Sequence, residues 1–549
     1  MLTFLSLLSV FQTPAPLPPI PSSEPIATPV TVPATAVNIS NLHSPIEHPS
    51  GSIHLPVQST YNPLVLASRP VTQPRSVRPL PGQLDTVPVF NSNSPEVIQQ
   101  EGVLLSTFPP ETMAEPTAHL NYAFDGRFDI FAHHVARGLT SDDIRTMYMG
   151  VIVHNPNASS VTLNISQAAT YLSQEAPFLD LPAYVANPLG TVFAGPGSRV
   201  MNDILRGIRQ PHWPTTITIP PQHTHLLMNL PIPLRRLEVP VNGTLPSGRL
   251  LLPPLPEPEV DETMASASLN SGLLPNTQDT RNDNRPLPTN GRTALVRLYS
   301  SGPVYVASLA MYAPMASEVH ERVPTLREWA NILTQKGLAG PRDYPPTPPD
   351  AEHFSRFFYG RVAGVAQGSQ WVATLTDSAQ SNALTIPASG QRFSYALSTL
   401  DHNTFGTGQI QSGPMVSRYP DTAYRAHGNY GVHYNLALPL HNNTNQPQDV
   451  VVAFETPIQD EDQEDALTFL EPPEDRIFFR GTVLVRYMDS WNIPQARYFH
   501  LVQRRGQEGE PLVRLRMQPG DRRPVKVEFL YPPDATPPQV LTVETLPKK

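Results

Sequence analysis

Proline is the residue that most constrains the fold of this chain. The sequence holds 66 prolines among 549 residues, roughly twice the ~5% share of an average protein. Proline lacks a backbone N–H and breaks helix interiors, so we expect short strands, turns and extended segments. Collagen is excluded because the sequence has no Gly-x-y period. The composition therefore predicts a mainly β chain with few, short helices.

Charge and cysteine content exclude several classes of function. The net charge of −9 gives no field that gathers phosphates, which disfavours nucleic-acid binding. The chain has no cysteine, which excludes disulfides, thiol catalysis, cysteine zinc sites and iron–sulfur clusters.

The N-terminus resembles a secretion signal. Residues 1–11 read MLTFLSLLSVF, an apolar run of the right length, and small residues follow it. The usual basic start is missing, because the first charged residue is Glu24. We expect residues 1–15 to be a leader of an exported protein; an apolar tail packed on the body is the alternative. The next longest apolar stretch, 304–316, is shorter than the ~20 residues a membrane helix needs.

Composition shifts divide the rest of the chain. Residues 16–76 are rich in Pro, Ser, Thr and Val, which favours an extended, disordered spacer. We expect a first domain at 77–340, with a proline-rich insertion at 240–290. The sequence PRDYPPTPP indicates a hinge over 341–352, and a second domain follows at 353–546.

Short alternating runs predict strands in both domains. Residues 147–153 and 161–165 flank a turn that begins near Asn155, and we expect them to form a hairpin. A second expected hairpin surrounds Asn442. In each domain a further strand pair follows in the same order, at 217–222 and 226–231 in the first and at 515–520 and 525–531 in the second. The matching order predicts two related antiparallel β-sandwich (Ig-like) domains.

Two helices are expected. The first begins after Thr325, which forms a capping box with Glu328, and ends at Gly337 as a left-handed terminator. The second runs from its N-cap Ser198 to Gly207.

Groups of candidate metal ligands are present but incomplete. His223 and His225 share a strand face, and His133, His134, His427 and His433 add further imidazoles, yet no carboxylate stands at ligand spacing. The acidic run 460–465 and the group Asp279, Asp283 and Asn284 lack the spacing of a calcium loop. We expect the histidines to be polar surface residues and the acidic segments to be solvated loops, with calcium binding by the run 460–465 as the weaker alternative. No metal or cofactor is predicted.

Other chemical motifs are weak as well. The segment 195–199 (GPGSR) precedes the second expected helix and could cradle an anion, but a turn with an N-cap explains it. The nucleophile patterns Gly-x-Ser-x-Gly and Ser-x-x-Lys are absent from the sequence. Strand aromatics are interpreted as core residues rather than a sugar platform: Trp213, Trp371, Trp491, Tyr419, Tyr424, Tyr430 and Tyr434. No catalytic residue is therefore assigned.

Several long stretches resemble the cyanobacterial family known as domain of unknown function 3370. They lie at 78–110, 128–134, 193–207, 302–314, 419–434, 501–512 and 529–543. The resemblance implies an exported protein of the cyanobacterial cell envelope with no assigned enzymatic role and no known site residues. The long spacer and the expanded insertion at 240–290 depart from the family pattern.

The expectation from the sequence is a non-catalytic structural or interaction protein, located in the periplasm, at the outer membrane or outside the cell. Its partners would be envelope proteins or glycans, or further copies of itself. A carbohydrate-binding or carbohydrate-processing β-sandwich protein is the alternative.

Overall fold

The computed structural model describes residues 68–173, 179–235, 287–459 and 465–548. The predicted leader, most of the spacer, most of the insertion at 240–290 and most of the acidic run lie outside these ranges. The spacer boundary needs a correction, because Arg69–Pro74 forms strand β1 and Ser76–Arg78 forms strand β2. Both predicted domains fall within one unit, Val65–Lys549.

The prediction of a mainly β fold is confirmed, and the strands of the described residues form four sheets. The largest contains β3 (Pro88–Ser92), β4 (Val97–Ile98), β5 (Gly102–Ser106), β6 (Phe124–Arg137), β7 (Thr146–His154), β8 (Val161–Leu172), β10 (Thr216–Ile219), β11 (Thr224–Pro233), β12 (Thr289–Tyr312), β13 (Ala363–Gln367), β17 (Gly413–Arg418) and β18 (Arg425–Ala426). The second contains β9 (Tyr184–Ala186), β14 (Gln370–Thr374), β15 (Leu384–Thr385), β19 (His433–His441), β22 (Ile477–Met488), β23 (Pro494–Arg504) and β25 (Arg522–Leu530). The third contains β2, β16 (Arg392–Leu397), β20 (Gln448–Glu455), β24 (Pro511–Met517) and β26 (Gln539–Thr545), and the fourth pairs β1 with β21 (Ala466–Glu471).

Strand β12 joins two layers of the largest sheet. Its N-terminal part pairs with β6 and β8, whereas its C-terminal part pairs with β5 and β7. β12 is one 24-residue strand, and its pairing with β6 has a register shift between Ser300 and Val304. Buried side chains from both layers fill one hydrophobic core.

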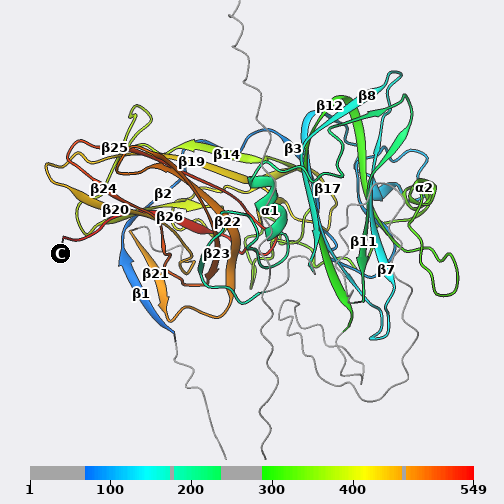
Figure 1. Cartoon of the computed structure of the whole chain (residues 1–549). Helices are drawn as coiled ribbons and strands as arrows, with labels where there is room; N and C mark the ends of the chain where they lie inside the picture. Colours follow the sequence, from blue (N-terminus) through cyan, green and yellow to red (C-terminus); the bar gives the residue numbers. More distant parts are fainter. Residues whose placement is uncertain (1–67, 174–178, 236–286, 460–464, 549) are drawn as a thin grey trace, which may run out of the picture. The chain divides into compact units, whose positions relative to one another are not determined.

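The C-terminal half consists mainly of two facing sheets. In Figure 1, β14, β19 and β25 lie above β20, β24 and β26. Side chains from both sheets share one core, in which Tyr434 and Phe529 stack with ring centroids 5.2 Å apart and Phe454 meets Phe529 edge-on.

The two halves also exchange strands. β13 of the C-terminal half pairs with β3, and β9 of the N-terminal half pairs with β23. β2 pairs with β16, although more than 300 residues separate them in the sequence. Each half therefore contributes a strand to a sheet that is formed mainly by the other half.

The prediction of two hairpins is wrong. β7 pairs with β11 and β12, whereas β8 pairs with β10 and β12. Likewise β19 and β20 lie in different sheets. Both turns are arches that cross from one layer to the other. The sequence could not distinguish an arch from a hairpin, because strand alternation and a short polar turn are common to both. The two halves nevertheless share a pattern of strand pairing. In the N-terminal half β10 pairs with β8 and β11 pairs with β7, and in the C-terminal half β24 pairs with β20 and β25 pairs with β19.

One buried asparagine fixes each arch. Asn155 Nδ2 donates to the carbonyls of Ser159, Ile219 and Pro220 at 2.8–3.0 Å. Asn442 Nδ2 makes the same set of bonds, to the carbonyls of Gln446, Met517 and Gln518 at 2.9–3.1 Å. Both asparagines are fully buried. Each amide thus connects its own arch to the following turn, which also crosses between the layers.

Replacing Asn442 by alanine should lower the free energy of unfolding by roughly 3 kcal/mol, because three backbone carbonyls, among them the buried carbonyl of Met517, lose the buried amide that bonds them. The exposed neighbour Asn443→Ala is the matched control and should change little. Urea unfolding followed by circular dichroism measures both. Equal stability of the two variants would contradict the role of Asn442.

The helices lie close to their predicted positions. α2 (Leu326–Gln335) begins with the predicted capping box between Thr325 and Glu328. It ends at Lys336 in extended backbone, so Gly337 is not the predicted left-handed terminator. α1 (Ser198–Leu205) has Gly197 as its N-cap instead of Ser198. In the described ranges neither helix is long and apolar enough to cross a membrane.

Candidate interaction surface

The histidines considered as candidate metal ligands differ in burial and in their contacts. His223 is exposed, while His133 and His134 are buried. His133 Nδ1 lies 2.8 Å from Thr293 Oγ1, and His134 bonds the Ser92 hydroxyl and a backbone carbonyl. Nowhere in the described ranges do three His, Asp or Glu side chains gather as a metal site would require.

The glycine turn before α1 also has a local explanation. Gly195 lies against the buried ion pair of Arg480 and Asp534, which are 2.6 Å apart. The Arg199 guanidinium lies over the rings of Tyr171 and Phe193. These contacts explain the segment as a turn that packs α1 between the two halves.

Most of the proposed platform aromatics are core residues, as predicted. Trp213, Trp371, Tyr419 and Tyr434 are buried, and Trp371 Nε1 donates to the Pro81 carbonyl at 2.9 Å. Trp491 is different: it lies at the turn between β22 and β23 and is 80% exposed.

A small cavity lies where the halves meet. Asn91, Asp129, Ser369 and Tyr430 contribute to its lining, and its volume of about 10 Å³ is that of a single water. Burial raises the pKa of Asp129, which Arg297 opposes from 3.5 Å. The cavity is too small for an organic substrate.

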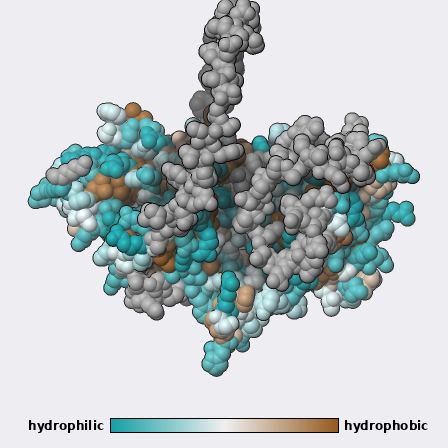
Figure 2. Space-filling view, turned by 90° about the horizontal axis from the view of Figure 1, so that it is seen from below, coloured by the Kyte–Doolittle hydropathy of each residue, from teal (hydrophilic) through white to brown (hydrophobic). Residues whose placement is uncertain are grey.

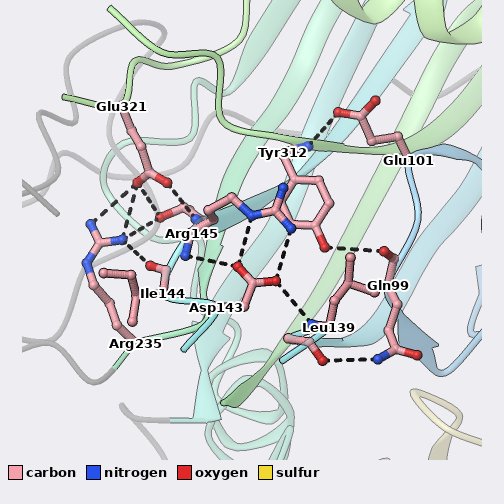
Figure 3. A network of polar contacts seen from close by, with 11 residues as sticks. Gln99, Glu101, Leu139, Asp143, Ile144, Arg145, Arg235, Tyr312 and Glu321 are labelled. Atoms are coloured by element: carbon pink, nitrogen blue, oxygen red, sulfur yellow. Dashed lines mark hydrogen bonds and ion pairs between the residues drawn. The ribbon is translucent and has the colours of Figure 1, made fainter. Parts of the chain in front are cut away.

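Figure 3 shows a network of charged groups beside β7 and β12. Asp143 accepts two hydrogen bonds from Arg145, at 2.9 and 3.0 Å, and the Arg145 guanidinium stacks on Tyr312. Glu321 accepts from the backbone and hydroxyl of Thr146 and pairs with Arg235. Partial burial opposes ionisation of Asp143, but the Arg145 hydrogen bonds hold its pKa below the usual value. These charges neutralise one another, so the network is a structural clamp.

The most exposed group of aromatic residues lies in the predicted hinge and just beyond it. The segment 342–361 between α2 and β13 is a loop that contains Phe354–Tyr359 (FSRFFY), here called the aromatic loop. Thr347 N donates to the Phe358 carbonyl at 2.8 Å, and Phe358 N donates to Thr347 Oγ1 at 2.9 Å. These two bonds close the base of the loop.

One side of the aromatic loop packs on histidines. The Phe357 ring lies 4.6 Å from His402 and 5.0 Å from Tyr359, measured between centroids. Phe354 also meets His402, and Tyr359 meets His427 at 4.6 Å. Five rings therefore form one continuous contact chain.

The other side faces outward. Tyr344 and Phe358, here called the outer pair, have centroids 4.7 Å apart and are 70% and 37% exposed. Phe354 is 42% exposed, and the Arg356 guanidinium lies 5.4 Å from the Phe358 centroid. Aromatic faces beside a cation are typical of contact surfaces.

Polar bonds hold the aromatic loop from beneath. The Tyr359 hydroxyl donates to the Asp401 carbonyl at 2.6 Å and accepts from Asn403 Nδ2 at 3.0 Å. The Asp401 carboxylate lies 3.1 Å from His427 Nε2 and 3.5 Å from Arg425.

The protonation states follow from these contacts. The hydrogen bond with His427 lowers the pKa of Asp401. Burial lowers the pKa of His427, and the hydrogen bond with Asp401 opposes this shift. His427 Nδ1 has no hydrogen-bond partner among the described residues.

The supporting backbone is strained. Ser398, His402 and Phe405 have φ values of 56°, 60° and 53°, which non-glycine residues seldom adopt. Ser398 N donates to Gln411 Oε1 at 2.6 Å, and Leu400 and Asn403 exchange two backbone bonds. Such strain persists where the surroundings enforce it, and it is frequent at functional sites.

Exposed apolar residues also occur elsewhere in the described part of the chain. Where grey atoms do not cover it, the face in Figure 2 shows small hydrophobic groups separated by hydrophilic residues. The sequence reasoning missed the aromatic loop, although four aromatic residues within six, in a segment without strand alternation, were a usable signal.

A family model described as a protein of unknown function, DUF3370, matches residues 75–545. A comparison with curated proteins gives no match. The match spans most of the chain, including both halves and the aromatic loop. This chain therefore belongs to the DUF3370 family of proteins of unknown function.

Proposed function

We propose that this chain is an exported, non-catalytic interaction protein of the cyanobacterial cell envelope that contacts its partner through the aromatic loop. Its place would be the periplasm, the outer membrane surface or an extracellular layer. The signal-like run at residues 1–11 supports export. Two Ig-like sandwiches, at 77–340 and 353–546, remain part of the proposal, and the facing sheets of the C-terminal half support it.

The observation that carries the proposal is the combination of exposed rings with a fixed support. Exposing Tyr344, Phe354 and Phe358 to water is unfavourable, because each ring would contribute to stability if it were buried. The hydrogen bonds of Tyr359 and of His427 with Asp401 hold the loop in place, so that it does not fold over the exposed rings. A pre-organised aromatic surface of this kind lowers the entropic cost of binding a partner.

Cosedimentation of the full chain with isolated envelope fractions tests the proposal. The wild type should pellet with one fraction, and Phe354→Ser with Phe358→Ser should reduce the bound share at least about fivefold, since two contact rings are lost. Val372→Ser with Val416→Ser, at two exposed strand positions, is the matched control. Equal retention of both variants, or no retention of the wild type, would contradict the proposal.

A carbohydrate-binding role is the second candidate, and Trp491 favours it. Asp489 Oδ1 accepts from the backbone N–H of Trp491 and of Ile493, both at 2.9 Å, so a fixed turn presents the indole. A glycan array should then show binding that Trp491→Ala removes. Trp371 is no suitable probe because it is buried. An array without signal would reject this candidate.

A further inference from the structure

The chemistry of the aromatic loop favours a ligand with apolar rings over a sugar. A sugar needs several hydrogen-bond partners beside the ring faces, but the polar groups at the base of the loop are engaged within the protein. Thr347 Oγ1 accepts from Phe358 N, and Asp401 accepts from Tyr359 and His427. What remains for a ligand is the outer pair, the Phe354 ring and the Arg356 guanidinium.

Proline-rich segments match this surface. A polyproline II segment has no internal hydrogen bonds, so its carbonyls are open to a donor such as Arg356. Its proline rings pack on exposed aromatic side chains, which is how aromatic grooves recognise Pro-rich peptides. The segment is extended before binding, and little conformational entropy is lost when it docks.

The chain itself contains such a ligand sequence. Residues 16–35 read PLPPIPSSEPIATPVTVPAT, with seven prolines among twenty residues and Glu24 as the one charged residue. This composition favours polyproline II. Every copy of the protein therefore brings a candidate ligand at a concentration equal to its own.

We propose that the aromatic loop of one copy binds the proline-rich segment 16–35 of a second copy. The inference rests on the proposed function, because it assigns a ligand to the same contact surface. The contact joins two different surfaces, so it is heterologous and can extend from copy to copy. Head-to-tail association of this kind builds a layer or filament without any further partner.

Binding of a labelled peptide with the sequence of residues 16–35 to the full chain tests the contact directly. Fluorescence anisotropy should show saturable binding. The same peptide with Pro18, Pro19 and Pro21 replaced by alanine should bind at least about tenfold more weakly, because its polyproline II conformation is weakened.

Variants of the body locate the binding site. Tyr344→Ser with Phe358→Ser should weaken peptide binding about tenfold or more, whereas Val372→Ser with Val416→Ser should leave it unchanged. Both pairs are surface positions, so circular dichroism should confirm that each variant folds. Residues 16–35 of the full chain can compete with the labelled peptide. This competition is the same in the wild type and in the control, so it does not affect their comparison.

Analytical ultracentrifugation measures the association itself. The wild-type mass should rise with concentration, and the three proline substitutions placed in the full chain should abolish that rise. Equal binding of the two peptides, or unchanged binding by the Tyr344→Ser and Phe358→Ser variant, would overturn the inference. If the wild type still cosediments with envelope fractions in that case, only the ligand assignment fails; if it does not, the proposed function fails too.

Discussion

Acidification from pH 7.5 to pH 4.5 should unfold this protein. Three buried histidines and the half-buried His433 have strongly lowered pKa values: desolvation brings His133 and His433 to about 3, and His134 and His500 to about 4. In the unfolded chain each would titrate near 6.5. The unfolded state therefore binds more protons throughout the range between these values.

The sign and the size follow from linkage. A histidine whose pKa is lowered by folding contributes its full stability above pH 6.5 and loses it as the pH falls towards the folded value. At pH 4.5 each of the four costs roughly 3 kcal/mol, and together they remove an amount comparable to the whole stability of a typical domain. Burial also raises the pKa of Asp534, to about 6, and the pKa values of Glu96, Asp129, Asp203 and Glu455, so these carboxyl groups oppose part of the loss.

Tryptophan fluorescence and circular dichroism against pH measure the transition, and His500 offers a specific check. Neither ring nitrogen of His500 has a hydrogen-bond partner among the described residues. His500→Leu should therefore change stability little at pH 7.5 and raise it by about 2–3 kcal/mol at pH 4.5. The exposed His353→Leu serves as the control. A chain that stays folded at pH 4.5, or a His500→Leu variant with unchanged acid stability, would contradict this account.

Local features of the fold could be predicted from the sequence, and features that depend on distant strands could not. The capping box of Thr325 and Glu328 involves neighbouring residues, so the sequence locates it directly. The order of elements around Asn155 and Asn442 indicated two similar halves. Whether each turn joins neighbours in one sheet or crosses between layers depends on which strands pair, and alternation carries no such information.

The same limit explains the unexpected strand arrangement. Residues 300–303 (SSGP) have the composition of a turn, yet β12 continues through them because β6 and β8 pair with the part before them and β5 and β7 with the part after them. The pairing of β9 with β23 joins segments that are far apart in sequence. No local sequence pattern indicates that two such distant segments will pair.

The candidate surface was missed for a different reason. The sequence reasoning sought aromatics on strands, and those residues pack inward, as the buried Trp371 and Tyr434 show. The exposed rings lie in a proline-rich loop, where strand alternation gives no signal. An aromatic run outside any strand or helix period is therefore the pattern to search for in a chain of this composition.

Replacing Arg75 by methionine should destabilise the protein by about 3–5 kcal/mol, because it leaves the buried Glu455 carboxylate without its cation. Arg75 Nη1 lies 2.7 Å from Glu455 Oε2, and both side chains are almost completely buried. The Thr542 hydroxyl also donates to this carboxylate, and the Arg75 guanidinium lies over the Phe469 ring. Burial raises the pKa of Glu455, and Arg75 is the main group that opposes this shift.

Because of the position of Arg75, its replacement should loosen one region of the chain in addition to lowering the overall stability. Arg75 lies between β1 and β2, the first described strands, and fixes them to sheets formed by the last third of the chain. Arg75→Met should therefore also expose the connection near residue 75 to proteolysis before the rest of the chain unfolds.

Two matched variants separate the charge effect from lost packing. Adding Glu455→Gln to Arg75→Met removes the unpaired carboxylate and should restore most of the lost stability in urea unfolding at pH 7.5. Arg69→Met breaks the neighbouring but exposed pair with Glu471 and should change little, because solvent screens that interaction. If the double variant is as unstable as Arg75→Met alone, the loss comes from packing of the arginine stem against Phe469 and not from the buried charge.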